Sequence, residues 1–216
     1  MSRSSERRSQ LRSHSRQDVC APSGNWRTFC AIEIPTTVAA RVADHINSLR
    51  EAFPEVRASW TRAGKFHLTL KFLGEVPRSR VDDLSRAAEH VTASLAPFKA
   101  VVEGTGAFPK SGPPKVLWLG ISDFQGELTE LHKRLENECA TEGFAKEERP
   151  FHPHLTIARL RATHDARPLG SLHRDMGFAA VEISVNELLV IRSELSSEGS
   201  KYTVISRRPL TGKADI

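Results

Sequence analysis

The sequence has few of the features that mark cross-linked, metal-bound or membrane-embedded proteins. Its three cysteines, Cys20, Cys30 and Cys139, are odd in number and lack C-x-x-C spacing. This argues against a disulfide framework and against a structural zinc site. No segment approaches the roughly 18 uninterrupted apolar residues that a membrane helix needs, and no apolar run of a secretory signal begins the chain. We therefore expect a soluble protein in a reducing compartment, the cytoplasm, without membrane association.

Positive charge is concentrated at the N-terminus. Residues 1–25 contain five arginines against two acidic residues, a net charge of +3, so the remaining residues carry only +2 of the chain's +5. A body so nearly neutral predicts local rather than extended contact with nucleic acid. The Arg/Ser-rich tail at 1–25 cannot bury a core, so we expect disorder there. A solvated tail, a misplaced start codon, a transit peptide and an RNA-binding arm all remain open for it.

Periodicity in residues 26–216 predicts one α+β domain. The connections near 101–119 and 190–204 are too short for helical crossovers, which favours antiparallel pairing. Residues 161–177 are polar and irregular, and we expect a loop there that could lie over a site. The expected strands and helices are these: strands at 26–34, 65–76, 98–104, 116–121, 151–160, 181–193 and 201–207; helices from an N-cap at Thr36 or Thr37 to about 53, from 78 to about 95, and from 124 to about 142.

The most informative feature is an internal near-repeat. FHLTLKFLG at 66–74 and PHLTIARL at 153–160 both contain His-Leu-Thr followed by an aliphatic residue, with the histidines 87 positions apart. This separation is about half of the folded portion, as expected for two similar lobes. Residues i and i+2 of a strand share a face, so His67 should lie beside Thr69 and His154 beside Thr156. If the lobes face each other, two His-Thr pairs meet in one cleft.

Two such pairs suit the cleavage of a phosphodiester. In-line displacement needs a base for the entering water and an acid for the departing oxygen, and histidine can act as either near neutral pH. Threonine hydroxyls can donate hydrogen bonds to the nonbridging phosphoryl oxygens without a metal. The sequence therefore predicts a shared site with His67 and His154 as its acid and base, and with no cofactor.

For the residues near the motifs, the sequence pattern allows more than one position or role. Arg159 could add a cationic donor, but five positions after His154 it would face away unless the strand bulges or ends first. Phe72 could stack on a base, although alternation assigns it to the apolar face. Lys71 is expected either to lean toward phosphate or to be a solvated surface lysine. His152 is interpreted as structural or as support for the site. The other histidines are expected on the surface: His14, His45, His90, His132, His164 and His173.

Several segments in order resemble the two-histidine phosphoesterase superfamily. Within it, the chain is most similar to the RNA 2′,3′-cyclic phosphodiesterases of the ThpR/LigT type, formerly described as 2′-5′ RNA ligases and known for their HxTx motifs. The resemblance spans about residues 27–210. It rests on RTFCAIEIP, FHLTLKFLGEV, GTGAFPKSGPPKVLWLGI, RPFHPHLTIARL and ELLVIRSELSSEGSKYTVISRRPL.

The resemblance implies a bilobal α+β fold in which two antiparallel-rich sheets are related by pseudo-twofold symmetry around a central cleft, with helices outside. It also implies hydrolysis of a terminal 2′,3′-cyclic phosphate to a 2′-phosphomonoester. It implies that His67 is the proton donor to the leaving 3′ oxygen and that His154 is the proton acceptor that activates water. Thr69, Thr156 and Arg159 match phosphate-contacting positions, and Phe72 matches an aromatic position near the base. Members also run the reaction in reverse without ATP, joining a cyclic end to a 5′-hydroxyl.

We expect RNA 3′ ends or oligonucleotides with a 2′,3′-cyclic phosphate as the substrate, a monomer, and no protein partner. Two alternatives remain. One is a metal-dependent phosphohydrolase with His67, His152 and His154 as ligands, which is weakened by the lack of a neighbouring carboxylate or an H-E-x-x-H pattern. The other is an RNA-end-binding protein without turnover.

Overall fold

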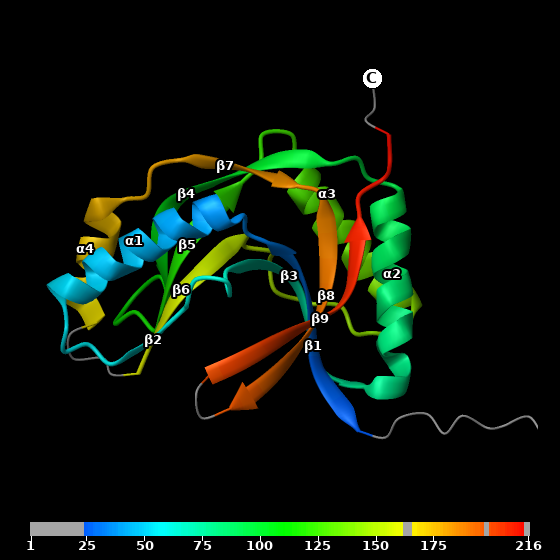
Figure 1. Cartoon of the computed structure of the whole chain (residues 1–216), viewed down its shortest axis with the longest axis horizontal. Coiled ribbons are helices and arrows are strands. Elements are labelled where there is room, and N and C mark those ends of the chain that lie inside the picture. Colours follow the sequence, from blue (N-terminus) through cyan, green and yellow to red (C-terminus); the bar gives the residue numbers. More distant parts are fainter. Residues whose placement is uncertain (1–23, 162–165, 197–198, 214–216) are drawn as a thin grey trace, which may run out of the picture.

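The strands of the chain form two separate sheets in which every pairing is antiparallel, as the computed structural model shows (Figure 1). The structure describes residues 24–161, 166–196 and 199–213. The first sheet has the order β3-β1-β8-β9 and consists of β1 (Asn25–Glu33), β3 (His67–Pro77), β8 (Glu187–Ser196) and β9 (Gly199–Pro209). The second has the order β2-β6-β5-β4-β7 and consists of β2 (Ala58–Trp60), β4 (Phe98–Phe108), β5 (Val116–Ser122), β6 (His154–Leu160) and β7 (Val181–Val185).

Helices lie outside both sheets. The helices are α1 (Thr36–Ala52), α2 (Val81–Ala93), α3 (Glu127–Thr141) and α4 (Ala166–Met176), with a short 3₁₀ turn, η1 (Arg78–Arg80). α2 packs on β8, β9 and α3, and α3 also contacts β3, so this pair covers the first sheet. α4 packs on β4 and contacts α1, on the other side of the molecule (Figure 1). The architecture confirms the predicted α+β fold with two antiparallel sheets and outer helices.

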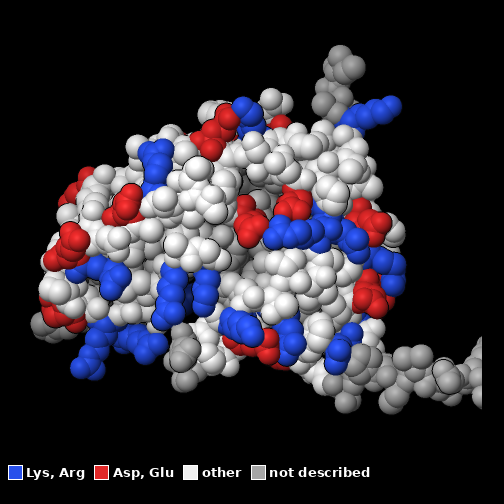
Figure 2. Space-filling model, viewed as in Figure 1, with Lys and Arg blue, Asp and Glu red and all other residues white. Residues whose placement is uncertain are grey.

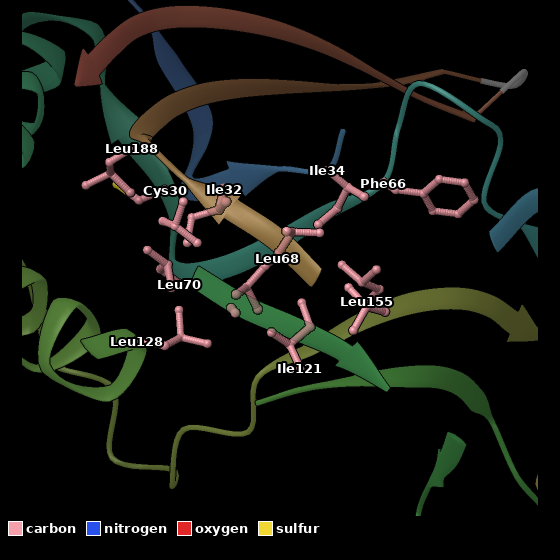
Figure 3. Packing of buried hydrophobic residues seen from close by; sticks show 14 of the residues in the cluster. Cys30, Ile32, Ile34, Phe66, Leu68, Leu70, Ile121, Leu128, Leu155 and Leu188 are labelled. Atoms are coloured by element: carbon pink, nitrogen blue, oxygen red, sulfur yellow. The ribbon is translucent and has the colours of Figure 1, made fainter. Parts of the chain in front are cut away.

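One buried cluster joins the two sheets. Leu68 of β3, Leu155 of β6 and Ile121 of β5 belong to it together with Leu128 of α3, and Figure 3 shows these side chains meeting between the strands. Each of the two motif strands therefore directs its leucine into a shared core. That packing holds the two lobes against each other and places their motif strands in contact.

Several sequence predictions need correction. Residues 166–176 form α4 rather than an irregular loop, because Ala166, Leu169, Gly170 and His173 make one buried helical face. The single strand expected at 181–193 is two strands, β7 and β8, separated at Asn186. Neither Thr36 nor Thr37 caps α1.

Other expectations lie partly outside the described residues. Of the tail expected to be disordered at 1–25, residues 1–23 lie outside the described part of the chain, and Asn25 is already the first residue of β1. His14 and His164 also lie outside the described residues. Within the described part of the chain, no helix combines the length and apolarity needed to cross a membrane.

Candidate active site

The two near-repeats occupy equivalent places in the two sheets. His67 is the first residue of β3 and His154 is the first residue of β6. In each case the next residue, Leu68 or Leu155, is buried in the common core, which turns the histidine to the opposite face. Thr69 and Thr156 are half-buried on that same face. The predicted His-Thr pairs are therefore present in both lobes.

Each motif strand bulges at the same point. In β3, Thr69 pairs with Ala31 and Lys71 with Cys30, so Leu70 has no cross-strand partner. In β6, Thr156 pairs with Trp118 and Ala158 with Leu117, so Ile157 has none. An extra residue lets two successive side chains point inward. The burial patterns agree, because Leu70–Lys71 and Ile157–Ala158 are buried pairs.

The bulges return the fifth residue after each histidine to the motif face. Arg159 therefore lies on the side of His154, and the bulge removes the objection raised by ideal alternation. Phe72 is the equivalent residue of the first lobe. It is 47% exposed, with the guanidinium of Arg27 at 4.5 Å from its ring centroid. The alternation-based assignment of Phe72 to the apolar core is wrong.

Lys71 lies in neither of its predicted places. Its side chain is buried, and its Nζ donates to Glu136 Oε2 at 2.7 Å and to the backbone oxygen of Ala145 at 2.8 Å. Glu136 belongs to α3, so the pair ties the bulged segment of β3 to the helix behind it. Because the bulge turns Lys71 inward, it is neither solvated nor on the motif face.

Both motif histidines are held through the same nitrogen. His67 Nδ1 lies 2.9 Å from the backbone oxygen of Lys65, and His154 Nδ1 lies 2.6 Å from that of His152. A carbonyl oxygen only accepts, so Nδ1 carries the proton in each neutral ring. Nε2 is then the nitrogen with the lone pair. His152 thus supports His154 through its backbone rather than its imidazole.

The two histidines share an electrostatic environment. Burial lowers the pKa of His67, the hydrogen bond to Lys65 opposes this, and the positive charge of Arg159 lowers that pKa further. Burial also lowers the pKa of His154, against its bond to His152, and Arg159 again adds to the lowering. A single guanidinium acts on both rings. Burial and the charge of Arg159 thus favour the neutral form of both imidazoles in the free protein.

Aromatic rings that sequence patterns did not single out surround each histidine. Phe29 and Tyr202 have ring centroids 4.8 Å and 5.2 Å from that of His67. Phe108 lies 5.3 Å from His154 on the same measure, and Trp118 lies 6.2 Å from it. Phe29 and Trp118 lie beside the motif strands because β1 pairs with β3 and β5 pairs with β6. The pairing of these predicted strands was the sequence signal that could have identified the two rings. Tyr202 comes from β9, the far strand of the first sheet, and was not predictable locally.

Other histidines differ from the surface positions expected for them. His45 and His173 are buried and bonded to each other, with Nε2 of His45 2.9 Å from Nδ1 of His173. His132 stacks on Phe151 with ring centroids 4.0 Å apart. His90 is exposed as predicted.

Among the described residues, no three His, Cys, Asp or Glu side chains are grouped as they would be around a metal ion.

Two sheets that each present a His-x-Thr motif are what the resemblance to two-histidine phosphoesterases implies. Comparison with known proteins agrees. The model of the 2′-5′ RNA ligase superfamily matches residues 35–196, and the chain belongs to this family.

Named relatives are similar over most of the chain. A Thermotoga maritima protein named RNA 2′,3′-cyclic phosphodiesterase is 31% identical, covering 83% of this chain and 92% of its own. A Geobacillus stearothermophilus protein of the same name is 32% identical over 73% of this chain, which spans only about half (49%) of that relative. The crystal structure of E. coli LigT with 3′-AMP is 27% identical, with a TM-score of 0.68, covering 87% of this chain and 99% of that one.

Proposed function

We propose that the protein hydrolyses RNA 2′,3′-cyclic phosphate ends to 2′-phosphomonoesters by metal-independent acid-base catalysis between His67 and His154. The observation that carries the proposal is the matched placement of the two imidazoles. Each begins its strand, each is held at Nδ1 by the backbone two residues earlier, and Arg159 acts on both. The names of the relatives above give the activity its substrate class.

In this mechanism His154 Nε2 accepts a proton from water as the water oxygen bonds to phosphorus. His67, protonated at Nε2, gives its proton to the 3′ oxygen as the phosphorus–oxygen bond to that atom breaks. The products are a 2′-phosphate and a 3′-hydroxyl. Proton transfer by a positioned histidine typically contributes about 10²–10⁴-fold. The acid and base assignment follows the family resemblance.

The remaining groups stabilise the charge on phosphorus. Thr69 and Thr156 share the face of their histidines and can donate hydroxyl hydrogen bonds to the nonbridging oxygens. Arg159 supplies a charge-assisted donor to the same oxygens. Phe72 offers the ring face opposite Arg27 to the terminal base. No metal is needed for any of these steps.

The same proton transfers serve ligation. If the 5′-hydroxyl of a second RNA takes the place of water, His154 deprotonates that hydroxyl and the product is a 2′-5′ linkage, without ATP. We further propose that the protein acts as a monomer on RNA 3′ ends in the cytoplasm, without a protein partner. The buried free thiols of Cys30 and Cys139 fit a reducing compartment.

The test is product analysis with a short RNA ending in a 2′,3′-cyclic phosphate, in excess EDTA. Wild type should give a 2′-phosphate. His67→Asn and His154→Asn should each lose at least about 10²-fold in kcat/KM, the size expected for a lost acid or base. His90→Asn is the matched control, because this exposed histidine on α2 should leave the rate unchanged.

Three results would count against the proposal in different ways. Loss of activity in EDTA with recovery on adding zinc would favour the metallohydrolase. Tight binding of cyclic-ended RNA with no product would favour an end-binding protein. Full activity in both motif variants would remove the two histidines from the mechanism.

A further inference from the structure

A basic groove lies beside the candidate active site. It is a hollow of about 710 Å³ between α1, β2 with the loop after it, and the start of β9. Its volume is within the range of about 300–1,000 Å³ found for ligand sites. Five cationic side chains line it: Arg50, Arg62, Lys65, Arg159 and Arg161.

Three residues connect the basic groove to the motif histidines. Arg159 lines the groove and also lowers the pKa of both histidines. Tyr202 lines it and has its ring centroid 5.2 Å from that of His67. Lys65 lines it, while its backbone oxygen holds His67 Nδ1. One end of the groove is therefore the place where the reacting phosphate would lie.

The charge of the groove is not neutralised by its own lining. No Asp or Glu is among the described residues that line it. Some arginines elsewhere in the described chain do pair with carboxylates, as Arg86 does with Asp83 and Arg207 with Glu33. In the view of Figure 2, Lys and Arg side chains gather at the lower left, on the side where β2 lies in Figure 1. The near-neutral net charge of residues 26–216 thus hides a local cationic surface.

The lining also suits unpaired nucleotides. Trp60 of β2 is half-buried, lines the groove and also packs against the hydrophobic core. Asn47, Ser59 and Thr61 are polar residues of the same lining. Cationic side chains that follow a backbone, combined with an aromatic surface for bases, are the usual elements of single-strand binding. A single strand leaves its base faces free for such an aromatic surface, whereas the bases of a duplex are paired and stacked on one another. An RNA with its 3′-terminal phosphate at the histidines can extend only in the 5′ direction.

We propose that the basic groove binds the single-stranded RNA segment immediately 5′ of the terminal phosphate. The proposal rests on the proposed function for the direction of the strand, but not for binding itself. It makes oligonucleotides better substrates than cyclic mononucleotides, with the gain in KM. It also makes affinity salt-dependent, because each phosphate of a single strand that is bound by a cation contributes about 0.7 to the slope of log K against log salt.

The test compares Arg50→Gln/Arg62→Gln with the control Arg86→Gln/Arg134→Gln. The control removes the same charge from α2 and α3, away from the groove. Turnover is measured on a ten-nucleotide RNA with a 2′,3′-cyclic end and on a 2′,3′-cyclic mononucleotide. Binding is measured separately by fluorescence anisotropy with a labelled ten-nucleotide RNA bearing a 3′-hydroxyl, single-stranded and as a duplex, at several salt concentrations.

For the groove variant we expect a KM on the ten-nucleotide RNA at least about 10-fold higher, an unchanged rate on the mononucleotide, and a salt slope shallower by about 0.7 for each phosphate that the variant no longer binds. The control should match wild type in all three. Equal binding of the 3′-hydroxyl RNA by the groove variant and wild type would overturn the proposal, as would equal affinity for the duplex. Absence of turnover in wild type would contradict the proposed function alone, because the anisotropy result does not depend on it.

Discussion

Lys71 and Glu136 form a buried ion pair, and substituting Lys71 tests whether this lysine has a structural or a catalytic role. Lys71 lies between Thr69 and Phe72 in sequence, and a lysine there invites assignment to phosphate binding. In the structure its side chain is 2% exposed and that of Glu136 is 9% exposed, with 2.7 Å between Nζ and Oε2. We therefore expect Lys71→Met to lower stability and to leave substrate binding almost unchanged.

The expected magnitude follows from what the substitution leaves behind. Glu136 Oε2 would keep only the backbone N–H of Glu147 at 3.0 Å, and Oε1 already has no hydrogen-bond partner in the described structure, with His132 Nε2 at 3.9 Å. Removing one member of a buried ion pair typically costs about 3–5 kcal/mol, whereas replacing both by apolar residues is often neutral. For a domain of this size that cost corresponds to a fall in Tm of roughly 6–20 °C. Lys71→Met/Glu136→Leu should recover most of the loss.

Urea unfolding and kcat/KM measured on the same samples decide between the two roles. The matched control is Lys99→Met, because Lys99 and Glu182 form an exposed pair at 2.6 Å that should contribute less than about 1 kcal/mol. The reasoning is refuted if Lys71→Met lowers kcat/KM by about 10²-fold while the free energy of unfolding stays within about 0.5 kcal/mol of wild type. Such a result would place the ammonium on the substrate.

Two further predictions concern titration. Arg159→Gln should lower kcat/KM roughly 10- to 100-fold, the size of a lost hydrogen bond to a charged group. It should also move both limbs of the pH profile to higher pH, because the arginine depresses the pKa of both motif histidines. An unmoved profile would contradict this. His173 should titrate by NMR with a pKa of about 4, set mainly by burial. Folding favours the neutral form of His173, so the free energy of unfolding is unaffected by this group above about pH 6.5 and falls as pH falls toward 4, by about 3 kcal/mol in all by linkage. A His173 resonance that titrates near 6.5 would refute the assignment.

The sequence predicted the parts of the site that depend on local pattern. A strand's period of two is a short-range property, so His67 with Thr69 and His154 with Thr156 could be placed on common faces without the fold. The strands that carry them were located within a few residues. The near-repeat also indicated two similar lobes, and the paired sheets agree with it.

The sequence could not predict features set by contacts between distant segments. The bulges depend on the register of β3 against β1 and of β6 against β5, and they decided the places of Phe72, Arg159 and Lys71. The ion-pair partner of the buried Lys71, Glu136, comes from a helix 65 residues away in sequence. The cations of the basic groove are similarly dispersed in sequence, so net charge averaged over the chain did not reveal them.

Under the proposed mechanism, the equivalent bulges place unlike residues beside two similar histidines. A repeated strand supplies two similar histidines, yet acid-base catalysis needs one protonated and one neutral. The two lobes differ at the fifth residue after each histidine, which is the aromatic Phe72 in one lobe and the cationic Arg159 in the other. Arg159 depresses both histidine pKa values in the free protein. A bound phosphate neutralises that guanidinium and favours an imidazolium, so substrate binding itself would supply the condition under which one of the two rings holds its proton.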